Sequence, residues 1–127
     1  MSYQTLKAEI LSHAENITHN NLSTYSIKTQ GYKIHFLKLW PRYYALKKNG
    51  FKDWDLRSND REYSQLDIVV FLEWNFEKSK YTKQVMIRII THIEDIADFL
   101  EHHVIFTDKP FNEMDTLTPN KKEKIPC

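Results

Sequence analysis

The sequence predicts a single α+β domain with an N-terminal helix, an antiparallel sheet of about four strands, a long amphipathic helix packed on that sheet, and a flexible C-terminal tail. Three observations lead to this fold class. Apolar residues recur at helical spacing near the N-terminus, they alternate with polar residues in the middle of the chain, and they form a wide stripe over residues 79–103. A chain of 127 residues has the size of one domain. We therefore place the domain at residues 1–111 and a polar tail at residues 112–127.

The first predicted helix covers residues 3–17, where apolar side chains such as Leu6, Ile10 and Ala14 recur at steps of three and four. Ser2 precedes this stripe and is a suitable N-cap. From Leu22 onward the period changes to two, which is typical of strands with one buried face.

The middle of the chain carries the remaining strand signals. A second extended stretch is predicted at residues 43–46, and Asn49-Gly50 is a turn signal of the hairpin type. Residues 51–62 are mostly polar and predict a long loop. Residues 66–74 form the strongest strand signal, and because both of its faces are apolar we expect a central strand covered on two sides.

The stripe over residues 79–103 predicts the helix that covers the sheet. Its charges run against the helix macrodipole, because basic residues come first and acidic residues come last. One interpretation is that the acidic end of one copy meets the basic region of a neighbouring copy; the other is an unoptimised surface. Val104–Phe106 could add a short strand.

Composition excludes several classes of site. Only two glycines occur, so a glycine-rich phosphate loop is absent. The single cysteine is the last residue, which leaves no disulfide framework and no cysteine-based zinc site. No signal peptide or membrane span is expected. The histidines and carboxylates of residues 92–103 lack a recognised metal-ligand spacing, so we interpret them as a solvated face. We therefore expect no catalysis, no metal and no cofactor.

A basic and aromatic composition marks residues 28–57, where eight lysines and arginines face two aspartates and seven aromatic residues are interleaved. Cations that neutralise phosphates and aromatic rings that stack on bases suit single-stranded nucleic acid. A half-buried sheet with aromatics inward and lysines outward is the structural alternative, and it is the preferred interpretation of this alternation. The residues that would contact nucleic acid are Lys33, Lys38, Arg42 and Tyr43.

The segment from Trp40-Pro41 through a long polar excursion to Tyr63 and the strand Leu66–Leu72 resembles the tail terminator proteins of long-tailed phages, the family of the lambda minor tail protein that caps the tail tube. The resemblance implies a structural virion protein assembled in the host cytoplasm, a homo-oligomeric and typically hexameric ring that joins tail tube to head connector, with DNA passing through it. A related neck protein fits equally well. The expected interface residues are Lys47, Lys48, Lys52, Trp54, Arg57, Arg88, Glu94, Asp95, Asp98 and Glu101.

The alternative to a ring protein is a small binding module. It would bind single-stranded nucleic acid, or it would block a partner protein as immunity and anti-defence proteins do. Salt-dependent affinity for oligonucleotides distinguishes the first of these from the others.

Overall fold

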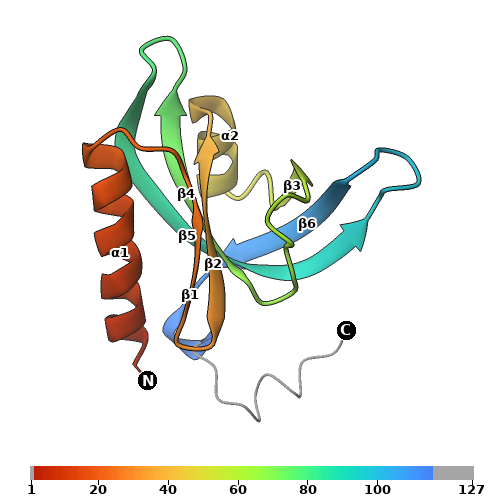
Figure 1. Cartoon of the computed structure of the whole chain (residues 1–127), viewed down its shortest axis with the longest axis horizontal. Helices are drawn as coiled ribbons and strands as arrows, with labels where there is room; N and C mark the ends of the chain where they lie inside the picture. The colour runs from red at the N-terminus through yellow and green to blue at the C-terminus, as the bar shows by residue number, and fades with distance from the viewer. Residues whose placement is uncertain (1, 116–127) are drawn as a thin grey trace.

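The computed structural model describes residues 2–115, and its main feature is a strongly curled sheet of six strands (Figure 1). The elements in chain order are α1 (Tyr3–His19), β1 (Ser26–Thr29), β2 (Tyr32–Leu39), α2 (Pro41–Lys48), β3 (Trp54–Ser58), β4 (Ile68–Asn75), β5 (Lys80–Asp95), β6 (His103–Pro110) and the 3-10 helix η1 (Glu113–Asp115). Residues 116–127 of the predicted tail lie outside the described residues. No helix within the described part of the chain is long and apolar enough to span a membrane.

The six strands form one mixed sheet in the order β1-β2-β4-β5-β6-β3. Strands β2 and β4 are parallel, whereas the other neighbouring strands are antiparallel. The sheet curls into a half-barrel with β1 and β3 at its two ends (Figure 1). The predicted antiparallel sheet of about four strands is therefore wrong: the sheet has six strands with one parallel pair, and residues 2–115 are mostly β with only two short α-helices.

Helix α1 and the central strand agree with the sequence patterns. The Ser2 hydroxyl accepts a hydrogen bond from the Thr5 amide at 3.0 Å and caps α1. The helix buries Leu6 and Ile10 against one face of the sheet. Strand β4 contributes Val70 to that core and Phe71 to a second core on the opposite face, so it is covered on two sides as predicted.

The predicted long helix over residues 79–103 is wrong, because residues 80–95 form the 16-residue strand β5 and the chain then turns into β6. Seven of the 16 residues of β5 are β-branched, which favours a strand over a helix. Alternate side chains of β5 enter the two cores: Val85 and Ile87 pack on one face, and Met86 and Ile93 pack on the other. Because both faces of β5 are apolar, the same residues also fit the apolar stripe of a helix. The apolar pattern alone therefore does not distinguish a helix from a buried strand here.

Residues 41–48 form helix α2, although an extended stretch was predicted at residues 43–46. Pro41 occupies the first turn, where its fixed φ suits a helix. Asn49-Gly50 ends this helix instead of forming a hairpin. Gly50 has φ +82°, its amide donates to the Lys47 carbonyl at 3.1 Å, and the Phe51 amide donates to the Leu46 carbonyl at 2.8 Å. This pair of hydrogen bonds is a Schellman cap, and its C′ position requires the left-handed backbone that glycine adopts readily.

The predicted loop over residues 51–62 contains strand β3, which pairs with β6 from Trp54↔Thr107 to Ser58↔His103. The predicted short strand at Val104–Phe106 lies within the longer β6. Helix α2 packs on the face of the sheet opposite α1, with Tyr44 buried in the second core (Figure 1). The start of α2 and strand β3 consequently lie on the same side of the molecule, where they border a hollow.

Candidate nucleic-acid interface

A groove lies between the start of α2 and strand β3, with a cavity volume of about 440 Å³. The residues that line it are Lys38, Leu39, Trp40, Tyr43, Lys52, Trp54, Asp55, Leu56 and Arg57. They come from the end of β2, from the first turn of α2, from the loop after α2 and from β3. The Schellman cap at Gly50 returns the chain toward the groove, which places Lys52 and Trp54 opposite the first turn of α2.

Aromatic rings are the most prominent feature of the groove. Trp40, Tyr43 and Trp54 are 51%, 37% and 47% exposed. Trp40 stands just before Pro41 with an extended backbone, and Tyr43 follows three residues later on the same side of the helix. Their rings stack with centroids 6.2 Å apart and an interplanar angle of 26°, and Phe76 contacts the Trp40 ring with centroids 5.0 Å apart. The groove therefore offers exposed aromatic faces in a fixed orientation.

The Lys52 ammonium lies between two of these rings. Its Nζ is 4.3 Å from the centroid of the Trp54 ring and 5.5 Å from that of the Tyr43 ring. It also donates a hydrogen bond to the Trp54 carbonyl at 2.6 Å. Burial lowers the pKa of Lys52 below its ordinary value of 10.5, while the nearby Asp55 carboxylate opposes the shift. This cation is incompletely solvated, so an anion that entered the groove would stabilise its charged form.

Buried charges beneath the groove, which we call its floor, contact the lining residue Asp55. The Lys47 Nζ lies 2.7 Å from Asp108 Oδ2 and 2.8 Å from Asp55 Oδ2, and the Arg88 guanidinium pairs with the other oxygen of Asp108. Arg57 lies 3.6 Å from the Asp55 carboxylate. Burial raises the pKa of Asp108, and its ion pairs with Lys47 and Arg88 oppose that shift.

These ion pairs join α2, β3, β5 and β6, and together they carry an excess of positive charge. The cations Lys47, Lys52, Arg57 and Arg88 outnumber the carboxylates of Asp55 and Asp108 by two. Each deeply buried charge has a partner, as burial requires. The floor is thus a rigid electropositive support beneath the aromatic rings.

A second hollow of about 250 Å³ shares Lys38 and Arg57 with the groove and extends it toward Arg61. The Arg61 guanidinium donates to the Phe36 carbonyl at 2.9 Å, and the Arg57 guanidinium donates to the Lys38 carbonyl at 3.3 Å. Both arginines therefore connect β2 to the chain around and after β3. Their positive charges extend from the groove along the line where β3, at one end of the curled sheet, lies near β2.

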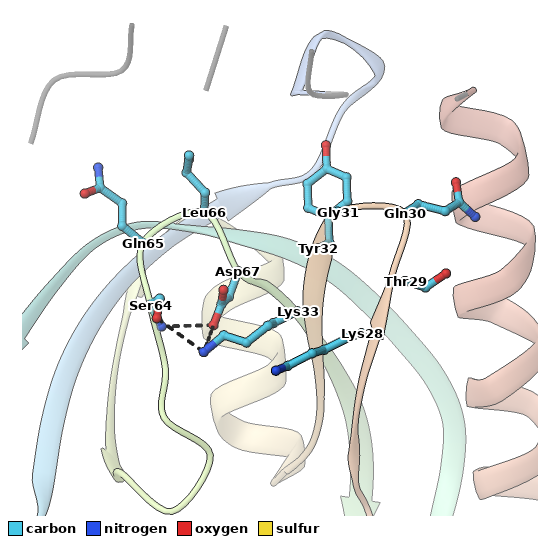
Figure 2. A pocket seen from close by; sticks show the side chains of 10 residues that line it. All are labelled: Lys28, Thr29, Gln30, Gly31, Tyr32, Lys33, Ser64, Gln65, Leu66 and Asp67. Carbon is cyan, nitrogen blue, oxygen red and sulfur yellow. Dashed lines mark hydrogen bonds and ion pairs between the residues drawn. The ribbon is translucent and has the colours of Figure 1, made fainter. Parts of the chain in front are cut away.

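A larger hollow, of about 680 Å³, lies elsewhere, at the turn between β1 and β2 and the loop before β4 (Figure 2). Of its two basic side chains, Lys28 and Lys33, the latter points toward Ser64 and Asp67, with Nζ 3.3 Å from Ser64 Oγ and 3.6 Å from Asp67 Oδ2 (Figure 2). Its one aromatic lining residue, Tyr32, is only 5% exposed. This hollow offers no exposed aromatic face, so it suits base stacking less well than the smaller groove.

The structure brings some of the predicted contact residues together and separates others. Tyr43, Lys52, Trp54 and Arg57 meet in the groove. Lys38 also lines it, but its ammonium lies 3.7 Å above the centroid of the Trp74 ring. The remaining positions divide by burial: Lys47 and Arg88 are buried beneath the groove, Lys33 lines the other hollow, and Arg42 and Lys48 are exposed on α2.

The four acidic residues of the predicted interface lie together elsewhere. Glu94, Asp95, Asp98 and Glu101 are exposed on the hairpin between β5 and β6. In the part of the chain that the structure describes, no group of three histidine, cysteine, aspartate or glutamate side chains is placed to hold a metal ion.

Several groove residues were missed in the sequence. Trp40 was noted in the Trp-Pro step and among the interleaved aromatic residues but was not assigned to a site, and neither were Asp55 and Asp108. The signal for Asp55 was its place two residues before Arg57, because alternate positions of a strand share a face. No local signal marked Asp108, since its partners Lys47 and Arg88 are distant in sequence.

Comparison with known proteins gives a family and a phage relative. The chain is 33% identical over 73 residues to an uncharacterized 12.9 kDa protein in the GpA 3′ region of Escherichia phage P2. The match covers 58% of this chain and 65% of the phage protein, so it spans just under two thirds of that relative's length. A phage protein is thus among the relatives, which agrees with the phage association predicted from the sequence but not with the tail terminator family.

The family match covers residues 34–107, from β2 to β6, which is more than half of the chain and includes every residue that lines the groove. The chain therefore belongs to the family described as "Domain of unknown function (DUF3850)".

Proposed function

We propose that this protein is a small binding module for single-stranded nucleic acid, and that the groove between α2 and β3 is its binding site. The observation that carries the proposal is the gathering of exposed aromatic rings and cations around one hollow. Trp40, Tyr43 and Trp54 supply faces on which bases can stack, while Lys52 and Arg57 supply charge for phosphates.

The geometry favours single strands over duplexes. Bases within a duplex are stacked on each other, so their faces are not available to an aromatic side chain. The groove offers ring faces and no protruding helix that could enter a major groove, because α2 packs against the sheet through Tyr44 and Lys47. We therefore expect binding to depend on unpaired bases and to show little preference for sequence.

In the free protein, Lys52 occupies the space between the Tyr43 and Trp54 rings. A base that stacked on either ring would displace the ammonium toward the phosphate of the same nucleotide. An ion pair with that phosphate would then replace the cation–π interactions of Lys52, and the base would cover the ring faces.

The tail-terminator or neck function is the competing proposal. The phage relative is compatible with it, but the predicted long helix that would have covered the sheet and carried the head-to-tail contact is strand β5. The groove gives the binding module a specific site, so we favour that function. A second binding alternative, the blocking of a partner protein, would not require a cationic floor beneath exposed aromatic rings.

Fluorescence anisotropy with a labelled oligothymidylate, measured over a series of salt concentrations, tests the proposal. Trp54→Ala should weaken binding by roughly tenfold or more, because stacking on one base is worth about 1–3 kcal/mol. Lys52→Gln should make the slope of log K against log salt shallower by about 0.7, which is the share of one phosphate contact on a single strand.

Lys7→Ala is the matched control, because Lys7 lies on α1, across the sheet from the groove. This variant should bind like the wild-type protein. If the wild-type protein ignored oligonucleotides at low salt, or if Trp54→Ala and Lys52→Gln behaved like Lys7→Ala, the groove would not be a nucleic-acid site.

A further inference from the structure

The hairpin formed by the end of β5, the turn after it and the start of β6 projects from the curled sheet (Figure 1). We call residues 92–103 the acidic arm. Its tip exposes Phe99 to 92% and Leu100 to 43%, and Phe99 is the most exposed large hydrophobic side chain in the described residues. Hydrogen bonds fix this turn, since the Phe99 and Leu100 amides donate to the Ile96 carbonyl at 2.8 and 2.9 Å. The ring is therefore presented to solvent by an ordered backbone.

The charge of the arm is uniformly negative. Residues 92–103 include Glu94, Asp95, Asp98 and Glu101 but no lysine or arginine. The ion pairs that Glu94 and Glu101 make with neighbouring histidines are exposed and contribute little. A complementary surface would be positively charged and would contain an apolar hollow large enough for a phenyl ring.

The groove of the same protein has this chemistry. It combines the cations Lys52 and Arg57 with the exposed rings of Tyr43 and Trp54, and its cavity of about 440 Å³ can accept one aromatic side chain. Aromatic rings that meet at such a hollow gain energy beyond the apolar area they bury. The two surfaces are therefore complementary in charge and in apolar character.

The arm cannot enter the groove of its own chain. Strand β3 pairs with the base of the arm from Trp54↔Thr107 to Ser58↔His103, so the tip lies beyond the end of β3 that is farther from Trp54. The two ends of β3 are separated by about 13 Å at an ordinary strand rise of about 3.3 Å per residue. The pairing directs the tip away from its own groove, which leaves the groove of a second copy as the complementary surface.

We propose that two copies of this protein associate by placing each acidic arm in the partner's groove, with Phe99 packed against the exposed rings. A two-fold arrangement satisfies both arms and both grooves at once and closes the assembly at a dimer. Because the arm occupies the groove, the dimer and a nucleic-acid complex would exclude each other. The dimer itself does not depend on nucleic-acid binding.

Sedimentation velocity over a concentration series at low and high salt tests the dimer, with no oligonucleotide present. The wild-type protein should dimerise at low salt and dissociate as salt screens the charges. Asp98→Lys combined with Glu101→Lys on the arm should abolish the dimer, and so should Lys52→Glu in the groove. When these two variants are mixed, the reversed arm of the first can enter the reversed groove of the second. The unchanged arm of the second also matches the unchanged groove of the first, so the dimer should return.

Glu15→Lys combined with Glu113→Lys is the control, because it changes the net charge by the same amount at exposed positions on α1 and η1, away from both surfaces. It should leave the dimer intact. Trp54→Ala and Phe99→Ser test the apolar contact without changing any charge, and circular dichroism establishes that each variant is folded. A monomeric wild-type protein at low salt, a dimer that survives arm reversal, or a mixture that stays monomeric would overturn the proposal.

Discussion

The groove and the acidic arm both expose aromatic side chains, but they are built in different ways. The groove rests on a buried network in which Lys47 pairs with Asp55 and Asp108 at 2.8 and 2.7 Å and Arg88 pairs with Asp108, so that four elements are joined. The arm is held by strand pairing and by the hydrogen bonds of its turn, and its side chains beyond residue 96 are exposed or half-buried. One surface is thus fixed by tertiary packing, whereas the other is local structure extended into solvent.

Because of this difference, substitutions in the two regions should affect the stability of the fold and the recognition of partners differently. The residues under the groove contribute to both, since a change there disturbs the cores as well as the floor of the site. The residues of the arm tip contribute to recognition alone, because their removal leaves no cavity and no unpaired buried charge. Substitutions in the two regions should therefore differ in stability even when both affect binding.

Asp108→Ala should produce the largest loss of stability. It removes the carboxylate that pairs with Lys47 and Arg88 and leaves both cations buried without that partner. Removing one partner of a buried pair costs about 3–5 kcal/mol. Urea unfolding followed by circular dichroism measures the change, with Asp98→Ala on the arm as the matched control, which should stay within about 0.5 kcal/mol of wild type. Equal losses for the two variants would contradict the distinction between groove and arm.

Alkaline pH should destabilise the side of the sheet beneath the groove. Burial raises the pKa values of Tyr44 and Tyr63 from 10.0 to about 12. Because the folded state favours the protonated phenol, the stability contributed by each tyrosine is complete below pH 10 and is lost as the pH rises to about 12.

Tyr63→Phe tests this prediction, since it keeps the ring and removes the titrating group. The free energy of unfolding of the wild-type protein should fall between pH 10 and pH 12, at about 1.4 kcal/mol for each unit of raised pKa, and the variant should lose less over the same range. Parallel pH profiles for the two proteins would show that Tyr63 does not titrate differently in the folded and unfolded states.

The two regions also differ in how far their sequences predicted them. The basic and aromatic composition of residues 28–57 was visible in the sequence, but Tyr43 was assigned to nucleic-acid contact and Lys52, Trp54 and Arg57 to a subunit interface. The network below them was not predicted, since Lys47 is 61 residues from Asp108 and only the fold brings them together. The local sequence shows which residue types are present, but which of them are buried together depends on the tertiary structure.

The arm was predicted as half of a helix, and its acidic residues were recognised while their setting was wrong. Residues 80–95 have apolar side chains on both faces, so period alone could not separate a buried strand from a helix. The seven β-branched residues of this segment were the better evidence. Helix α1 was predicted correctly because its stripe is narrow and Ser2 marks its start.

Phe99→Ser should have the smallest effect on stability and still abolish the proposed dimer. The side chain is 92% exposed, so its replacement should change the free energy of unfolding by no more than about 0.5 kcal/mol. Phe76→Ser is the informative comparison, because Phe76 is also exposed in a hairpin turn but its ring contacts the Trp40 ring of the groove. Tryptophan fluorescence of the monomer should change in Phe76→Ser and remain unchanged in Phe99→Ser, whereas sedimentation should register Phe99→Ser as a loss of the dimer. If Phe99→Ser instead lowered the unfolding free energy as much as a core substitution, the tip would be part of the folded core, and the arm could not be a surface that serves recognition alone.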